Sequence, residues 1–311
     1  MIQVQTGSSP LTQKSAVALG FFDGVHVGHR AVLQAAVEWA NAHGQLPCAF
    51  SFQADSLPKK QGIPLTYLYT DRQKQRLLTE CGIAALYCPA FDALKKWDGQ
   101  QFCQEVLVGL LRAEDVFCGS DFRFGKGAAW DGEMLRQFGA AMGFRVHLIS
   151  PVQCGTEKIS STMIRQCMLA GKPEQAAVLL GAPYEICGNV GHGAALGHTQ
   201  NVPTINLSFE QRQLVPRYGV YVSRTYTPEG VWNSITNIGI KPTVSTAPKP
   251  GAETFLLDFS GNLYGVMCRV ELLHFLRPER QFPDLAALYA QIALDEKNCR
   301  EWFMRHSQKK Q

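Results

Sequence analysis

The sequence predicts an α/β protein with an N-terminal Rossmann-like domain and a C-terminal small antiparallel β-barrel that ends in a helix. Three observations support this prediction. Short apolar runs alternate with helical stretches up to about residue 150, alternating strand-like segments follow Pro183, and 311 residues exceed the usual size of one domain. We therefore expect one domain over residues 1–182 and a second over residues 183–311.

The first domain alternates short buried strands with helices, which is the pattern of a parallel sheet. Its expected strands are 17–19, 48–52, 84–88, 116–118 and 146–149, and its expected helices lie near 30–43, 70–81, 99–112 and 131–142. In such sheets, ligands bind outside the carboxyl ends of the strands. Residues that directly follow a predicted strand are therefore the first candidates for a site.

The second domain consists of short alternating segments separated by Gly, Pro and Asn. Its expected strands are 186–190, 218–226, 232–238, 253–259 and 266–275, and a helix with apolar residues at helical spacing is expected from 285 to 304. This pattern predicts a small antiparallel barrel or sandwich.

Composition excludes several classes of protein. The formal net charge is +4 with no basic arm in either half, so we do not expect nucleic acid as a partner. No stretch approaches the roughly 18 consecutive apolar residues of a membrane span, and the N-terminus lacks a signal-peptide pattern. The ten cysteines are scattered through apolar segments without a C-x-x-C pair, which favours free thiols. We expect a soluble cytoplasmic protein without a membrane partner.

The most informative motif is a Gly-rich turn between the strand that ends at Leu19 and the next helix. It carries His26 and His29, which at this spacing can point the same way and donate hydrogen bonds to phosphate oxygens. Gly24 and Gly28 allow close approach of the backbone. A structural or metal-binding His pair is the alternative, but the strand, the glycines and the helix start all favour a phosphate site.

The chain resembles the bacterial bifunctional riboflavin kinase / FAD synthetase family from about residue 19 to residue 300. The resemblance rests on the order and spacing of segments 20–29, 119–125, 159–165, 188–193, 203–206, 237–243, 253–259, 263–265 and 275–279. It implies an N-terminal nucleotidyltransferase module and a C-terminal flavokinase module. The implied reactions are phosphorylation of riboflavin to FMN and adenylylation of FMN to FAD, with ATP as co-substrate and Mg²⁺ as cofactor. Apo-flavoproteins are the implied acceptors of FAD.

In the first module, the resemblance implies that His26 and His29 are catalytic and that Asp121 and Arg123 contact FMN. The implied contacts of ATP are Gly20, Phe21, Asp23, Gly28, Ser160, Ser161, Thr162 and Arg165. A hydroxyl-rich helix start followed by a planar cation suits a triphosphate, although residues 160–162 would also serve as an ordinary N-cap. A local ion pair is the alternative for Asp121 and Arg123.

In the second module, the resemblance implies that Glu253 is the catalytic base and that Thr204 and Asn206 hold magnesium and the ATP phosphates. Thr204 and Asn206 lie two residues apart, so on a strand both oxygens face the same side. A simple turn and a solvated acid are the alternative interpretations of these positions. The remaining implied contacts are Gly193 and His198 with ATP, and Asn237, Gly239 and Arg277 with the flavin, Arg277 on a loop that closes over both substrates.

Two segments depart from the family pattern. The family usually carries Gly-(Arg or Lys)-x-x-Gly before its Pro-Thr-x-Asn segment, whereas this chain has His198 and Asn201 at two of these positions. It also commonly carries Pro-His-Pro after its second strand, whereas residues 50–55 here read Phe-Ser-Phe-Gln-Ala-Asp. The histidine titrates near neutrality where a permanent cation is usual. His198 and Asn201 therefore keep open the alternative of an FMN adenylyltransferase with an impaired kinase module. A flavin-binding regulator without catalysis is a further alternative of another class.

Overall fold

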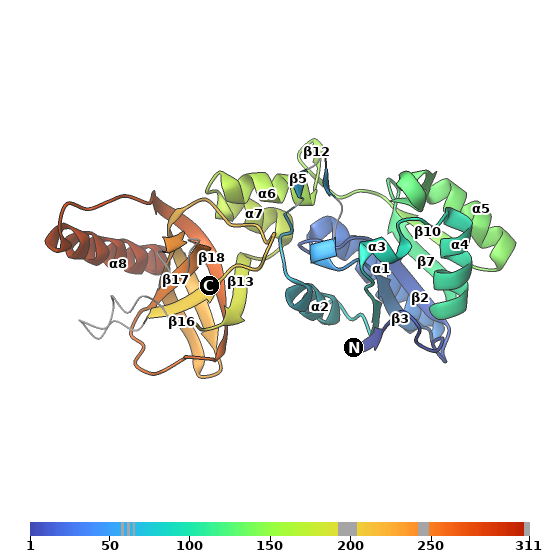
Figure 1. The fold of residues 1–311 in the computed structure, drawn as a ribbon, viewed down its shortest axis with the longest axis horizontal. Helices are drawn as coiled ribbons and strands as arrows, with labels where there is room; N and C mark the ends of the chain where they lie inside the picture. Colours follow the sequence, from blue (N-terminus) through green and yellow to red (C-terminus); the bar gives the residue numbers. More distant parts are fainter. Residues whose placement is uncertain (57–58, 61–62, 65, 192–203, 242–248, 308–311) are drawn as a thin grey trace. The chain divides into compact units, whose positions relative to one another are not determined.

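The computed structural model describes residues 1–56, 59–60, 63–64, 66–191, 204–241 and 249–307 (Figure 1). The chain forms two compact units, Met1–Ser161 and Thr162–Gln311. An α/β unit is followed by an antiparallel β unit with a terminal helix, so the predicted fold class is confirmed. The predicted domain boundary at 182/183 remains a proposal, and two helices before it, α6 (Ser161–Leu169) and α7 (Pro173–Leu180), belong almost wholly to the second compact unit.

A six-stranded parallel sheet is the centre of the first unit, with the strand order β1-β6-β3-β2-β7-β10. The strands are β1 (Ile2–Val4), β2 (Ser15–Leu19), β3 (Leu46–Phe50), β6 (Ala85–Tyr87), β7 (Ala113–Gly119) and β10 (Arg145–Ile149). The chain builds from β2 to β3 and β6 on one side, and later to β7 and β10 on the other. The strand order therefore reverses between β2 and β7, the place where doubly wound sheets bind ligands.

Helices and short hairpins complete this unit (Figure 1). The helices are α1 (Val27–His43), α2 (Asp71–Glu80), α3 (Phe91–Leu94), α4 (Gly99–Gln101), a π-helix over Phe102–Leu110 and α5 (Gly132–Met142). The two-stranded pairs are β4 (Lys59–Lys60) with β5 (Ile63–Pro64), β8 (Arg123–Phe124) with β9 (Trp130–Asp131), and β11 (Gln153–Cys154) with β12 (Glu157–Lys158). Apolar side chains of the strands, such as Val17 and Val116, pack against Phe102 and Leu107 of the π-helix in one buried core. This core fixes the sheet on which the first site is built.

The second unit contains a six-stranded antiparallel sheet with the order β13-β18-β15-β16-β17-β14. Its strands are β13 (Tyr184–Asn189), β14 (Thr204–Ser208), β15 (Gly219–Thr227), β16 (Gly230–Lys241), β17 (Lys249–Leu256) and β18 (Met267–Pro278). An isolated antiparallel bridge between Gly191 and Asn206 joins the two edges of the sheet, so the strands curve into a barrel. The final helix, α8 (Leu285–Ser307), lies along the outside of the barrel (Figure 1).

The two faces of the barrel wall differ in chemistry. Facing α8, Val222 and Ile235 pack with Cys299 and Phe303 of the helix. On the opposite face, buried hydroxyls of β15, β16 and β17 form a hydrogen-bonded chain that ends at Thr254. Because successive side chains of a strand alternate between faces, Glu253 next to Thr254 lies on the same face as the α8 contacts. None of the helices in the described ranges is long and apolar enough to cross a membrane.

Candidate functional sites

The first site lies where the strand order of the parallel sheet reverses. The histidine motif follows β2 directly, and Asp121 lies two residues after β7, so the carboxyl ends of two adjacent strands present both segments. This confirms the expected position of the motif between a strand and a helix. The arrangement gives a ligand access to the N-terminus of α1, whose first N–H groups favour negative charge.

The turn between β2 and α1 has an unusual backbone. Phe22 and Val25 adopt positive φ angles of 48° and 42°, and Gly24 between them has a φ of 84°. Positive φ is rare for a β-branched residue such as valine, and such strained conformations are concentrated at functional sites. The surrounding structure fixes this turn, since the Val25 N–H donates to the Phe22 carbonyl at 3.1 Å.

His26 is the N-cap of α1. Its Nδ1 atom accepts the backbone N–H of His29 at 3.2 Å, so the ring proton of neutral His26 belongs on Nε2. The two imidazole rings stack with their centroids 3.6 Å apart. The two rings thus form one stacked pair, in which His26 fixes the helix start through Nδ1.

The environment of His29 keeps its ring neutral. Burial holds the pKa of His29 well below its ordinary value, and the charges of His26, Lys158 and Lys74 lower this pKa further. Within the described residues, the buried Nδ1 atom of His29 has no hydrogen-bond partner. A neutral imidazole surrounded by basic groups suits a ligand that brings negative charge.

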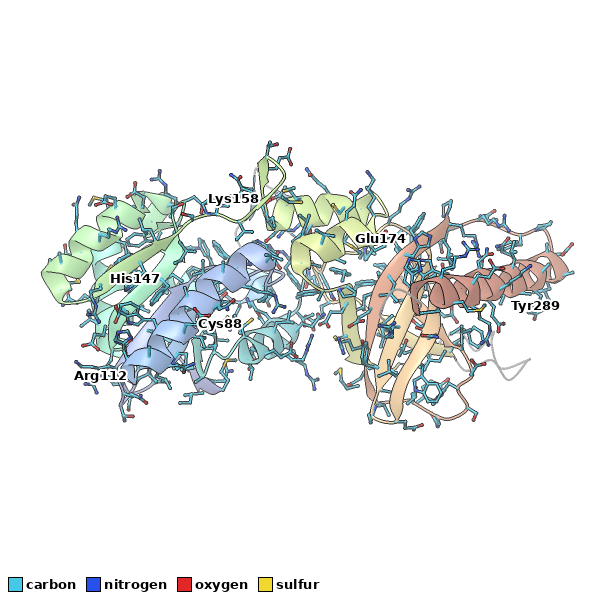
Figure 2. The ribbon with its side chains drawn as sticks, turned by 180° about the vertical axis from the view of Figure 1, so that it is seen from behind. Cys88, Arg112, His147, Lys158, Glu174 and Tyr289 are labelled. Atoms are coloured by element: carbon cyan, nitrogen blue, oxygen red, sulfur yellow. The ribbon has the colours of Figure 1, made fainter. Side chains whose placement is uncertain are left out.

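The sequence analysis missed these two lysines. Lys158, which is labelled in Figure 2, stands at the end of β12, directly before the Ile159–Ser161 segment. It forms an ion pair with Asp121. Its position beside the predicted ATP segment was a usable signal. Lys74 is buried on α2, where its Nζ donates to the Phe52 carbonyl at 2.5 Å and lies 3.1 Å from the Asp71 carboxylate. No local pattern marks Lys74, because only the packing of α2 brings it near His29.

The structure joins two of the predicted ATP segments through Asp23. The Ser161 hydroxyl donates to the Asp23 carbonyl at 2.9 Å, and the Asp23 carboxylate accepts the Leu68 N–H at 2.8 Å. A Cβ on Gly28 would lie 3.2 Å from the His26 ring and 3.8 Å from the Ile159 carbonyl, so glycine permits the close approach there. Asp23 and Ser161 therefore brace the turn from within.

Gly20 and Phe21 connect the turn to the loop after β3. A Cβ on Gly20 would lie 2.8 Å from the Phe22 ring, which explains the glycine. Phe21 is 44% exposed, and the centroids of the Phe21 and Phe52 rings are 5.5 Å apart. The Ser51 hydroxyl donates to the Phe21 carbonyl. Phe21 is thus an exposed aromatic residue of the turn that carries the histidine pair.

Asp121 and Arg123 are exposed and form separate ion pairs. Asp121 pairs with Lys158, and the Arg123 guanidinium lies 3.7 Å from the carboxylate of Asp131 on the adjoining strand β9. Exposed pairs of this kind contribute little to stability, so either side chain can exchange its partner for a ligand. Their role in flavin binding remains a prediction.

The last predicted ATP contacts lie at the start of α6. Ser160 directly precedes the helix, Thr162 is in its first turn, and Arg165 follows Ser161 by four residues and so lies on the same helix face. The expected helix start at these hydroxyls is confirmed by the position of α6. Contact of Thr162 and Arg165 with ATP remains a prediction.

The second site is a row of polar side chains across the barrel. Asn206 of β14 pairs with Glu253 of β17, and Glu253 pairs with Asn237 of β16 on its other side. Directly paired residues project from the same face, and all three side chains are half-buried. Thr204 lies on this face as well, two residues before Asn206. The buried Oδ1 atom of Asn237 has no hydrogen-bond partner among the described residues.

The position of Glu253 differs from the expected one. The sequence suggested a strand beginning at Glu253, whereas β17 begins at Lys249 and lies between β16 and β14. Glu253 is therefore in the middle of an interior strand, because the Gly251–Ala252 segment continues the pairing. A half-buried acid between two asparagines is not the solvated edge residue of the alternative interpretation.

The structure places Arg277 on β18, not on a loop. Its guanidinium donates to both carboxylate oxygens of Asp295 on α8, with distances from 2.7 to 3.0 Å, and Gln291 donates to the same carboxylate at 2.6 Å. The Glu279 carboxylate lies over Gly239, and a Cβ at this position would displace that exposed side chain, since it would lie 1.8 Å from Glu279 Oε1. Flavin binding by Asn237, Gly239 and Arg277 remains a prediction. Gly193 and His198, with the departing Asn201, lie outside the described residues.

Comparison with known proteins assigns both units. Residues 8–163 match the FAD synthetase family, and residues 180–303 match the riboflavin kinase family. The bifunctional riboflavin kinase/FMN adenylyltransferase of Escherichia coli K12 is 36% identical over 293 residues, 92% of each chain. The chain belongs to the bifunctional riboflavin kinase/FMN adenylyltransferase family.

Other relatives of this family agree. The enzymes with this name from Listeria monocytogenes and Bacillus subtilis are each 31% identical, over 92% and 93% of both chains respectively. A crystal structure described as a macrolide-efflux protein from Streptococcus pneumoniae has a TM-score of 0.84 and 27% identity, covering 97% of this chain and 100% of that one. The predicted resemblance is thereby confirmed.

Proposed function

We propose that this chain makes FAD from riboflavin in two steps: riboflavin and ATP give FMN and ADP, then FMN and ATP give FAD and pyrophosphate. Matches to both the FAD synthetase and riboflavin kinase families, and relatives named for both activities, support the two steps. The observation that carries the proposal is the pairing of Glu253 with Asn206 and Asn237. Nothing in the described barrel favours the alternative with an impaired kinase or the non-catalytic regulator.

In the kinase step, Glu253 accepts the proton of the ribityl 5′-hydroxyl as the oxygen attacks the γ-phosphorus of ATP. The bond between the γ-phosphorus and its bridging oxygen breaks, and ADP leaves with the electron pair. A carboxylate held in mid-strand suits this role because its position is set by the sheet on both sides. Asn237 supplies a buried carbonyl oxygen that can accept a donor of the flavin.

The donor set of β14 fits Mg²⁺. Thr204 and Asn206 present a hydroxyl and a carboxamide oxygen on one half-buried face beside Glu253, and neutral oxygens suffice when phosphates supply the charge. The bound ion would neutralise developing charge on the phosphates. Thr204 and Asn206 would orient it relative to Glu253. Gly193 and His198 remain the proposed ATP contacts, and Gly239 and Arg277 the proposed flavin contacts, of this module.

In the adenylylation step, a phosphate oxygen of FMN attacks the α-phosphorus of ATP and pyrophosphate leaves. His26 donates from Nε2 to the phosphate as charge builds, and His29 stands beside it as a second, neutral donor. Gly20, Phe21, Gly28 and the braced Asp23–Ser161 pair shape the turn around the phosphates. Ser160, Thr162 and Arg165 are proposed to hold the triphosphate, and Asp121 and Arg123 the flavin.

We also propose a cellular location and a class of partner. All ten cysteines are unpaired, which suits a reducing compartment such as the cytoplasm. Apo-flavoproteins are the proposed acceptors of the FAD that is released.

A time course tests both steps together. The purified chain is incubated with riboflavin, ATP and Mg²⁺, and the three flavins are separated by chromatography. We expect FMN to rise first and FAD to follow. Unchanged riboflavin with FAD formed only from added FMN would support the alternative with an impaired kinase.

A further inference from the structure

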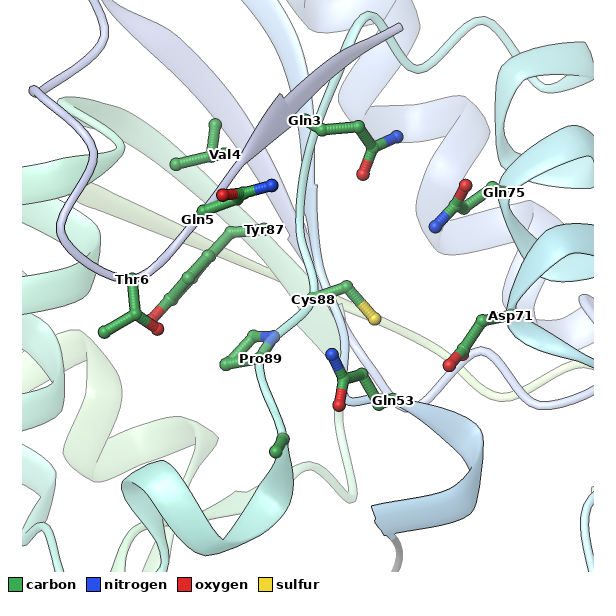
Figure 3. A pocket seen from close by; sticks show the side chains of 11 residues that line it. Gln3, Val4, Gln5, Thr6, Gln53, Asp71, Gln75, Tyr87, Cys88 and Pro89 are labelled. Carbon is green, nitrogen blue, oxygen red and sulfur yellow. The ribbon is translucent and has the colours of Figure 1, made fainter.

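A cavity of about 530 Å³ lies in the first unit, away from the histidine site (Figure 3). It opens at the carboxyl ends of β1 and β6, and β3 separates these strands from β2 in the sheet. Carboxyl ends of parallel strands are where such sheets hold ligands, and this volume is in the range that takes a small molecule. None of the residues assigned to either step lines it.

The lining of the cavity is rich in carboxamides. Gln3, Gln5, Gln53 and Gln75 all border it, and none of the four side-chain amides has a hydrogen-bond partner within the described part of the chain. In Figure 3 the amides of Gln3 and Gln75 face one another across the hollow, which the Cys88 thiol also borders. Gln3, Gln5 and Gln53 are exposed, so a ligand can reach them from solvent.

The cavity carries almost no net charge. Among its lining residues there is no lysine, arginine or histidine. The negative charge of its acidic lining residue, Asp71, is balanced by Lys74, whose ammonium lies 3.1 Å from the carboxylate. The same carboxylate accepts the Ala54 N–H at 2.9 Å. Burial raises the pKa of the Cys88 thiol to about 11, so this group is neutral too. A phosphate would find no counter-charge here, which distinguishes the cavity from the histidine site.

Carboxamides recognise a particular chemistry. Each offers one acceptor and two donors side by side, which matches the adjacent donor and acceptor on the edge of a nucleobase. Without a cation, the preferred ligand is an uncharged heterocycle and not a nucleotide.

One wall of the cavity also touches the first site. Gln53 lies in the segment that replaces the usual Pro-His-Pro of the family, and its N–H donates to the Pro89 carbonyl at 3.0 Å. The carbonyl of the preceding residue, Phe52, accepts a hydrogen bond from Lys74, and its ring contacts Phe21 of the turn that carries the histidine pair. Adjacent residues of one extended loop therefore face the cavity and the first site.

We propose that this cavity binds an uncharged heterocycle of nucleoside size through its glutamine carboxamides, and that binding changes the rate of adenylyl transfer through the 51–54 loop. The binding part stands by itself, and the rate effect rests on the proposed function.

Calorimetric titration of the full chain tests the binding part, with Mg²⁺ and ADP at saturation to occupy the nucleotide sites. Adenosine and uridine are the probes, and ribose is the probe without a heterocycle. We expect saturable binding of at least one nucleoside and none of ribose. Gln53→Leu and Gln75→Leu should each weaken it by about tenfold or more, because a bound polar edge loses its partner. The matched control is Gln137→Leu, an exposed glutamine of α5, which should bind as the wild type does.

Two results would overturn the site: no saturable binding of either nucleoside, or binding that Gln53→Leu and Gln75→Leu leave unchanged. Alkylation of Cys88, followed by mass spectrometry of its peptide, gives a local check, because a bound nucleoside should slow this alkylation several-fold.

The rate part is tested with FAD formation from FMN, with and without the nucleoside that binds. A change of about twofold or more that Gln53→Leu abolishes supports the coupling, and binding without a change in rate refutes it. If FAD does not form even without a nucleoside, the proposed function fails, whereas the titration result still decides the site.

Discussion

His26 accepts the backbone N–H of His29 through Nδ1 at 3.2 Å, so one histidine holds the helix turn that carries the other. The bond also fixes the tautomer of His26, because a nitrogen that accepts from an N–H cannot itself be protonated. The capping role is thus shown, and the proposed phosphate-binding role falls to the other nitrogen of the same ring. The two roles can be separated by substitution.

His26→Asn keeps a side-chain acceptor at the N-cap, whereas His26→Ala removes it. We expect the free energy of unfolding of His26→Asn to stay within about 0.5 kcal/mol of the wild type and that of His26→Ala to fall by about 1 kcal/mol. Both variants lose the Nε2 donor, so FAD formation from FMN should fall by about 100-fold or more. Urea denaturation and single-turnover assays measure the two effects. Wild-type FAD formation by His26→Asn would show that the ring only caps the helix.

His29 makes stability depend on pH. Its pKa is lowered in the folded protein, so below the ordinary value of 6.5 the unfolded chain binds the proton more readily than the folded one. The free energy of unfolding should therefore fall as the pH drops from about 6.5, and the loss should end once the pH passes the lowered pKa. His29→Gln removes the titrating imidazole, so the unfolding free energy of this variant should vary less steeply with pH than that of the wild type. Equal slopes in denaturation series from pH 7.5 down would contradict the low pKa.

Glu253→Gln tests the base of the kinase step. The substitution keeps the size and the hydrogen-bonding shape of the side chain between Asn206 and Asn237 but removes its basicity. FMN formation from riboflavin should fall by about 100-fold or more, because general-base catalysis contributes on that scale. FAD formation from supplied FMN should not change, which controls for misfolding. Riboflavin phosphorylation at the wild-type rate would remove Glu253 from this role.

Much of the fold could be predicted because hydrophobic periodicity indicates most helices and strands, and Gly and Pro indicate where many of them begin or end. Apolar runs marked five strands of the parallel sheet and five of the antiparallel sheet, whereas β14 was not among the expected strands. Gly44 and Gly143 mark the ends of α1 and α5. The edge strand β1 was not predicted, because three residues at the start of the chain carry too little pattern. The helix α7 was missed as well, although Pro173 at its first position and Gly181 after its end are usual signals.

The residues of the two sites also divide into those that the sequence could place and those that it could not. The motifs at His26 and Ser161 could be placed because each adjoins a strand or helix end, and the Asp23–Ser161 hydrogen bond confirms that the two segments meet. Long-range pairings could not be predicted. The sequence contains no signal that Lys74 approaches His29, or that Asp295 takes up the guanidinium of Arg277, since packing of helices brings these groups together.

The hydroxyl chain inside the barrel has a direction, and that direction predicts unequal costs at its two ends. Thr236 donates to Ser223 at 2.8 Å, so its single hydroxyl proton is used and Thr254 must donate to Thr236 at 2.9 Å. Either oxygen can donate in the Ser223–Ser234 and Ser234–Thr225 pairs, and we predict that the direction continues, with Ser223 donating to Ser234 and Ser234 donating to Thr225. Thr254 thus begins the chain as a donor, and in the predicted direction Thr225 receives the last proton.

Thr254→Val should cost about 1 kcal/mol of unfolding free energy, because it leaves only an acceptor lone pair of Thr236 without its donor. Thr225→Val should cost about 2 kcal/mol, because it leaves the Ser234 hydroxyl proton buried without an acceptor. Both residues are fully buried and valine has nearly the same shape as threonine, so cavity formation is similar in the two variants. Urea denaturation of both variants measures the difference. A larger loss for Thr254→Val would reverse the direction assigned to the chain.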